Sequence, residues 1–88
     1  MKRAHVVVHG DVQGVFFRDT LRGAAGDHGV AGWARNNSDG TVEAVFEGPE
    51  KAVDALVAVC HEGPRAAYVG DVEVSDEVPE GLTGFEVR

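Results

Sequence analysis

The spacing of apolar residues alternates between strand and helix periods along the chain, and this order constrains the fold more than any other feature. Residues 3–9 are rich in β-branched valine and alternate in polarity, which predicts a strand ending at Gly10. From Phe17 the apolar residues recur at helical spacing, and the glycines within residues 26–29 predict the end of that helix.

The second half of the chain continues the alternation. Residues 30–48 form two β-rich runs around an Asp-Gly pair, which is typical of a hairpin turn. Pro49 predicts the first turn of a second helix, which the glycine and proline of residues 62–64 close. Residues 67–75 alternate as a further strand, and residues 84–88 predict a short terminal one.

Together these elements predict an α+β fold of the ferredoxin-like βαββαβ type. We expect an antiparallel sheet with two helices on one face and a short extra C-terminal strand. No linker, internal repeat or low-complexity segment interrupts residues 1–88, so we expect a single domain.

Side-chain patterns also predict which positions are buried. Apolar residues in the second hairpin strand alternate with Glu43 and Glu47, so we expect one buried face and one solvated face. Trp33 in the first hairpin strand is expected in the core. Cys60 lies on the apolar stripe of the second helix, which favours the role of a small hydrophobic residue.

The charge balance restricts the classes of partner. Fifteen acidic and eight basic residues give a net charge of -7, which repels nucleic-acid backbones and anionic membranes. No window approaches the roughly 20 apolar residues of a transmembrane helix. The apolar stretch near the start is too short and polar for a signal peptide. We therefore expect a cytoplasmic monomer that binds neither nucleic acid nor membrane.

The residues that could bind a metal are poorly placed for it. On a strand, His5 and His9 lie about 13 Å apart, at about 3.3 Å per residue, too far to share one zinc ion. The single cysteine adds no second thiolate. We expect neither a metal nor a cofactor.

The segment between the first strand and the first helix has the features of an anion site. The first turn of a helix exposes unpaired N–H groups at the positive end of its dipole, and glycines let a loop direct several amides inward. Arg18 follows in that first turn, with a planar fork that suits two phosphate oxygens. The candidate loop residues are Gly10, Asp11, Val12, Gln13, Gly14, Val15 and Phe16. On spacing alone, the alternative is that the glycines only form turns and Arg18 is a solvated helix residue.

Two asparagines end the first hairpin strand. Asn37 is explained by the turn, where asparagine side chains cap the backbone. Asn36 is still on the strand, and its carboxamide can both donate and accept hydrogen bonds. A water molecule held there against a bound electrophile is a reasonable hypothesis.

Two long segments, "GDVQGVFFRD" and "GWARNNSDGTVEAVFEG", resemble the paired signature of the acylphosphatases. The later "EGPRAAYVGDVEV" and "GFEVR" are also similar to that family, so the resemblance covers essentially the whole chain. It implies the ferredoxin-like fold and hydrolysis of carboxyl-phosphate anhydrides to a carboxylate and inorganic phosphate, without a metal or covalent intermediate.

Carried over by position, the resemblance implies that the amides from about Gly10 to Phe16 and the guanidinium of Arg18 hold the phosphoryl group. Asn36 would then orient the attacking water. Two positions depart from the family pattern. Asp11 is an acid where relatives often have a basic or neutral residue, so we expect weaker substrate affinity without loss of activity. Ala34 replaces a valine, which should matter little.

Two other interpretations stay open. One is a non-catalytic ferredoxin-like module that binds an anion or another ligand for regulation. The other is a domain cut from a larger carbamoyl-phosphate-handling protein, although Met1 and the closing "GFEVR" favour a stand-alone protein.

Overall fold

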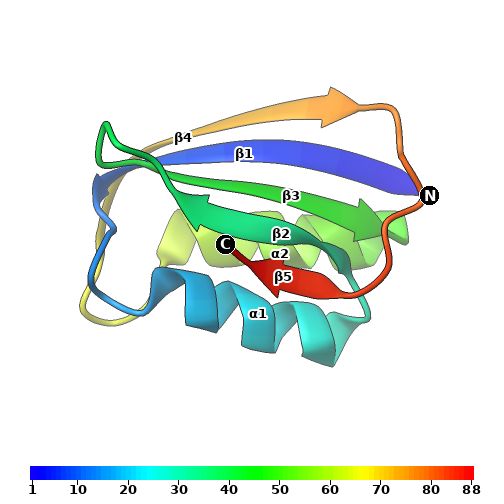
Figure 1. Cartoon of the computed structure of the whole chain (residues 1–88), viewed down its shortest axis with the longest axis horizontal. Coiled ribbons are helices and arrows are strands. Elements are labelled where there is room, and N and C mark those ends of the chain that lie inside the picture. The colour runs from blue at the N-terminus through cyan, green and yellow to red at the C-terminus, as the bar shows by residue number, and fades with distance from the viewer.

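The computed structural model describes residues 1–88 as a five-stranded sheet with two helices against one of its faces (Figure 1). The elements are β1 (Lys2–Asp11), α1 (Phe17–His28), β2 (Ala31–Asn36), β3 (Val42–Gly48), α2 (Glu50–Glu62), β4 (Tyr68–Glu77) and β5 (Phe85–Val87). This order confirms the predicted α+β, ferredoxin-like fold with an extra C-terminal strand. Neither helix has the length and apolar run that crossing a membrane requires.

The strands lie in the order β4-β1-β3-β2-β5. The first four pair antiparallel with their neighbours, but β5 pairs parallel with β2, so the sheet is mixed and not wholly antiparallel. The reason is the path between residues 78 and 84, which crosses from the β4 edge to the opposite edge at one end of the sheet (Figure 1). The chain therefore enters β5 from the end at which β2 also begins.

The core lies between the sheet and the helices. Each helix presents one apolar stripe, with Phe17, Leu21 and Ala25 buried on α1 and Leu56 and Cys60 buried on α2. Burying each large apolar side chain stabilises the fold by about 1.5 to 3 kcal/mol. Burial also raises the pKa of the Cys60 thiol to about 12. The complete burial of Cys60 in the core confirms its role as a small hydrophobic residue.

Gly10 does not end the first strand. β1 continues to Asp11, with a shift of register against β4 between His9 and Gly10. A Cβ atom on Gly10 would lie 2.1 Å from the carbonyl oxygen of Tyr68, and its φ of +127° disfavours other residues. Gly10 is therefore required by the close approach of β1 and β4, and the connecting loop begins only at Val12.

Trp33 is half-buried outside the core, which corrects the sequence expectation. Strand alternation gives the buried face, which packs against the helices, to its neighbour Ala34, so the indole lies on the opposite face of the sheet. The guanidinium carbons of Arg35 and Arg88 lie 5.3 and 4.7 Å from its ring centroid, in cation–π contacts.

Glu47 is also placed differently from the solvated position expected of it, because only 2% of it is exposed. It accepts hydrogen bonds from Arg3 (2.7 Å) and from the amides of Glu80 (2.9 Å), Gly81 (3.1 Å) and Leu82 (3.0 Å). Burial raises the pKa of Glu47, but these hydrogen bonds outweigh it and bring the pKa to about 2. The carboxylate thereby anchors the segment that crosses the sheet end.

Candidate active site

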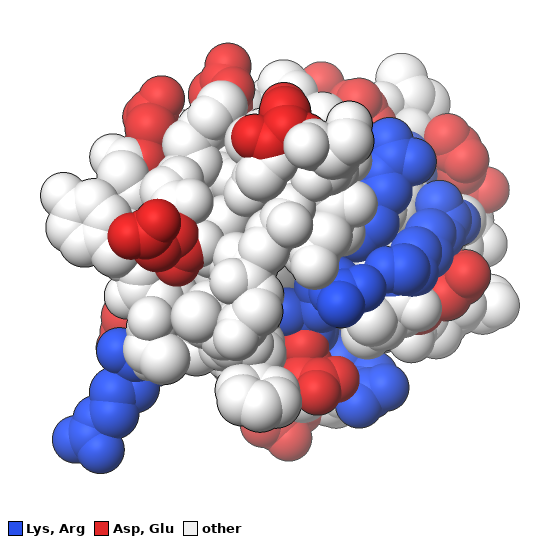
Figure 2. Space-filling view, turned by 60° about the vertical axis from the view of Figure 1, so that its left-hand side comes forward, with Lys and Arg blue, Asp and Glu red and all other residues white.

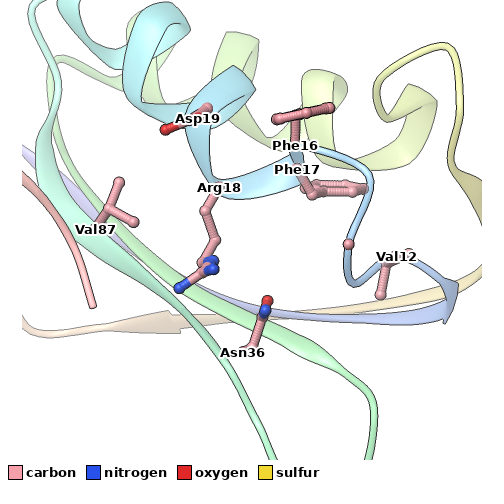
Figure 3. Close-up of a pocket in the computed structure, with 8 residues that line it drawn as sticks. Val12, Phe16, Phe17, Arg18, Asp19, Asn36 and Val87 are labelled. Atoms are coloured by element: carbon pink, nitrogen blue, oxygen red, sulfur yellow. The ribbon is translucent and has the colours of Figure 1, made fainter.

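A hollow of about 300 Å³ opens where the loop after β1, the start of α1 and the ends of β2 and β5 meet (Figure 3). Its walls combine an arginine and an asparagine with apolar groups. The lining residues are Val12, Gly14, Phe16, Phe17, Arg18, Asp19, Asn36 and Val87.

The loop into α1 offers a run of free donors. None of the five amides of residues 12–16 donates a hydrogen bond within the protein, and no side chain caps α1. Backbone N–H groups are strong donors, so in this largely exposed loop they can donate to water or to a bound ligand. The positive end of the α1 dipole adds to the attraction for an anion at this place.

The conformation of Phe16 shapes this loop. Its φ of 63° and ψ of 26° are left-handed, and it is the only non-glycine residue with positive φ. Such a conformation costs about 1 to 2 kcal/mol for a residue with a side chain. The ring is 77% exposed and lies away from the gap between Arg18 and Asn36 (Figure 3). Phe16 thus faces that gap with its main chain, and strain of this kind is typical of functional loops.

Arg18 is the second residue of α1 and points toward Asn36 across the hollow (Figure 3). Its Nη1 donates to the main-chain oxygen of Arg88 at 2.6 Å, and no Asp or Glu side chain lies within 4.0 Å of its guanidinium. Most of its donors are therefore available to a ligand.

Arginines gather beside the hollow in an otherwise acidic protein. The contacts of Arg18 with Arg88, and of Arg88 and Arg35 with the Trp33 ring, bring three arginines near one another. Arg35 and Arg88 also pair with Glu43 (2.8 Å) and Glu86 (3.5 Å), so only Arg18 lines the hollow without an acidic side-chain partner. Basic side chains form a band across one side of the face seen in Figure 2, among scattered acidic ones. The guanidinium of Arg18 and the positive end of α1 are therefore the groups that can attract an anion here despite the net charge of -7.

The structure separates the two asparagines. Asn37 donates from Nδ2 to the Thr41 hydroxyl at 3.0 Å, and its amide donates to the Thr41 carbonyl at 2.9 Å. It is therefore a turn residue, as predicted. The Asn36 side chain makes no hydrogen bond within the protein and lines the hollow. Its carboxamide is free to bind water or substrate.

The remaining predicted loop residues have supporting positions. Gln13 donates from Nε2 to the carbonyls of Asn37 (2.7 Å) and Thr41 (3.0 Å), which ties the loop to the hairpin. Val15 packs against the core. Gly10 and Asp11 belong to β1 and do not line the hollow.

Three lining residues were not predicted as site residues: Phe17, Asp19 and Val87. Phe17 and Asp19 flank Arg18 in the first turn of α1, so their position next to Arg18 in the sequence could have indicated them as site residues. Val87 gave no local signal, because only the parallel pairing of β5 with β2 brings it to the hollow.

The two histidines of β1 are paired with acids on the sheet. His5 Nε2 lies 2.6 Å from Glu43, and His9 Nε2 lies 2.6 Å from Glu73. The Glu73 hydrogen bond raises the pKa of His9. No three His, Cys, Asp or Glu side chains form a group that could hold a metal ion.

The fold and site define a small α+β protein with an open loop of free amides beside an arginine that has no acidic side-chain partner. The acylphosphatase family model matches residues 4–87, and the chain belongs to the acylphosphatase family.

Relatives and solved structures agree over almost the full length. An acylphosphatase from Haloarcula marismortui is 62% identical over 86 residues, which cover 98% of this chain and 94% of the relative. The crystal structure of an acylphosphatase from Bacillus subtilis superposes with a TM-score of 0.96 at 35% identity, covering 100% of this chain and 99% of that one. An acylphosphatase structure from Coxiella burnetii gives 0.94 at 39% identity, covering 99% and 92%.

Proposed function

We propose that this protein hydrolyses acyl phosphates to a carboxylate and inorganic phosphate at the hollow between Arg18 and Asn36. The observation that carries the proposal is the run of five unpaired amides, residues 12–16, beside an arginine without an acidic side-chain partner. The names of its relatives support the same chemistry.

The phosphoryl group would occupy the concave side of the loop. The amides of residues 12–16 and the guanidinium of Arg18 would donate to its non-bridging oxygens. Phosphoryl transfer needs little covalent assistance, so fixed donors around the phosphoryl oxygens can supply most of the catalysis. Gly10 and Asp11 would act through β1, with no contact to substrate.

The attacking water would be held by Asn36 on the opposite wall of the hollow. Its oxygen would form a bond to phosphorus while the bond between phosphorus and the acyl oxygen breaks, and the carboxylate would leave. The water proton would pass to a phosphoryl oxygen of the substrate, because a carboxylate is a good leaving group and needs no strong base.

The direct test is release of inorganic phosphate from benzoyl phosphate in the presence of EDTA. We expect wild-type turnover, a loss of about 100-fold or more in kcat/KM for Arg18→Gln, and a loss of about 100-fold for Asn36→Ala. Arg65→Gln removes the same charge from an exposed loop and should keep full activity.

The rival interpretation is a non-catalytic module that binds an anion. It would be favoured if wild-type protein bound phosphate but released none from the acyl phosphate. Full rates in both Arg18→Gln and Asn36→Ala would instead show that turnover occurs elsewhere.

We also propose that the protein acts as a cytoplasmic monomer on small-molecule acyl phosphates, with no nucleic-acid or membrane partner. The net charge of -7 supports this, because it opposes binding to polyanions. Analytical ultracentrifugation of the purified protein checks the monomer: a dimer at micromolar concentration would contradict it.

A further inference from the structure

A second hollow, of about 480 Å³, lies farther along the seam between α1 and β5. Its lining includes Arg22 and Ala25 of α1, Phe85 of β5, and Leu82 from the segment that leads into β5. Most of this surface is apolar or glycine, and Arg22 is the one charged side chain in it.

The two hollows are successive openings along one seam. α1 and β5 lie side by side and run in opposite directions (Figure 1). Arg18 and Arg22 are one helical turn apart, about 6 Å along α1, so both lie on the same side of the helix. On β5, Val87 reaches the first hollow and Phe85 reaches the second. A group extending from the first hollow along this seam therefore passes Arg22.

Arg22 is available to such a group. Its only acidic partner is Asp19, at 2.8 Å, in an ion pair whose two side chains are 58% and 55% exposed. Exposed pairs of this kind are weak and readily exchange partners. A carboxylate on a ligand can take the place of Asp19 on the guanidinium, with the body of the ligand against the apolar wall.

We propose that this seam receives the acyl part of the substrate, and that Arg22 selects acyl phosphates whose acyl group carries a second carboxylate on an apolar body. The inference rests on the proposed function, since it requires the phosphoryl group to occupy the Arg18 hollow. It assigns Arg22 to substrate specificity and gives it no part in the chemical step.

The experiment compares benzoyl phosphate with 4-carboxybenzoyl phosphate, which adds a distal carboxylate to the same rigid ring. The net charge of -7 alone predicts slower reaction of the more anionic substrate. We expect the opposite for wild type, with kcat/KM about fivefold higher for 4-carboxybenzoyl phosphate at low salt and a smaller preference at high salt.

Variants assign the preference to Arg22. Arg22→Gln should abolish it, Asp19→Asn should increase it by freeing the guanidinium, and Arg65→Gln should leave it unchanged. Equal wild-type kcat/KM for the two substrates, or a preference that survives Arg22→Gln, would overturn the inference while leaving the proposed function intact. Hydrolysis of neither substrate would overturn both.

Discussion

Arg3 and Arg18 lie near opposite ends of β1 and have contrasting surroundings. The Arg3 side chain is 8% exposed, and its nitrogens contact Glu47 at 2.7 Å, Glu77 at 2.8 Å and Glu80 at 3.5 Å. Arg18 contacts no Asp or Glu side chain and donates only to the main-chain oxygen of Arg88. Although the protein has 15 acidic residues, the position of Arg18 keeps every Asp and Glu side chain away from its guanidinium.

The contrast separates structural from functional charge. Around Arg3 every charge has a partner, and the cluster joins β1, β3, β4 and the segment leading to β5. Around Arg18 the donors of the loop and of the guanidinium exceed the acceptors that the protein supplies. We therefore expect the surroundings of Arg3 to govern stability and the surroundings of Arg18 to govern ligand binding.

The largest effect on stability is expected from Glu47→Gln. Breaking a buried ion pair leaves Arg3 without its buried partner and weakens three amide hydrogen bonds, so unfolding free energy should fall by about 3 kcal/mol. Urea denaturation measures the loss. At a temperature where the variant is folded, its kcat/KM should stay within about twofold of the wild-type value. A much larger loss would show that the Arg3 end of β1 also contributes to activity.

The pH dependence of stability should also reveal the contribution of Glu47. The folded-state pKa of Glu47, about 2, lies below its ordinary value of 4.5, so its stabilisation is complete above pH 4.5. That stabilisation is lost as the pH falls from 4.5 toward 2. Wild-type Tm should drop more steeply through this window than the Tm of Glu47→Gln, and parallel curves would contradict the assignment.

Gly10 of β1 and Gly14 of the following loop should differ in their effect on stability. Gly10→Ala places a methyl group against the Tyr68 carbonyl and should cost about 3 kcal/mol. Gly14 has a φ of +74° but open space around it, so Gly14→Ala should cost only about 1 kcal/mol. Chemical denaturation of both variants gives the comparison. Similar losses would mean that the β1–β4 contact does not set the need for Gly10.

Gln13→Ala sharpens the functional side of the comparison. It removes the two hydrogen bonds that hold the loop to Asn37 and Thr41, each worth about 1 kcal/mol. Less precise placement of the loop amides should lower kcat/KM for benzoyl phosphate by about tenfold. Unchanged kinetics would show that the loop keeps its shape without the hairpin.

The smallest effect is expected from Asp11→Asn. Asp11 lies on β1 outside the hollow, where solvent and salt screen its repulsion of substrate. KM should fall by less than about twofold at low salt and not at all at high salt. An unchanged or higher KM at low salt would show that this carboxylate does not oppose binding.

The order of elements and the core could be predicted because both follow from local periodicity. The helical stripe that includes Phe17 and Leu21 and the valine alternation of β1 bury the residues that their spacing indicates. The loop between β1 and α1, with Arg18 in the first helical turn, was also visible locally. Its role in binding stays a prediction.

Other features depend on contacts between distant segments. The burial of Glu47 requires residues 80–82 to return across the sheet end, and alternation alone would place it in solvent. Val87 reaches the hollow only because β5 joins β2 in parallel. Trp33 is outside the core because the hairpin register gives Ala34 the buried side. None of these placements follows from a short window of sequence.

The difference between the two arginines is tested most directly by titrating inorganic phosphate into ¹⁵N-labelled protein at low salt. We expect saturable amide shifts confined to residues 12–18 and Asn36, none around Arg3 and Glu47, and loss of the response in Arg18→Gln. Equal phosphate binding by Arg18→Gln, or shifts centred on the Arg3 cluster, would contradict the assignment of Arg18 as the anion-binding arginine.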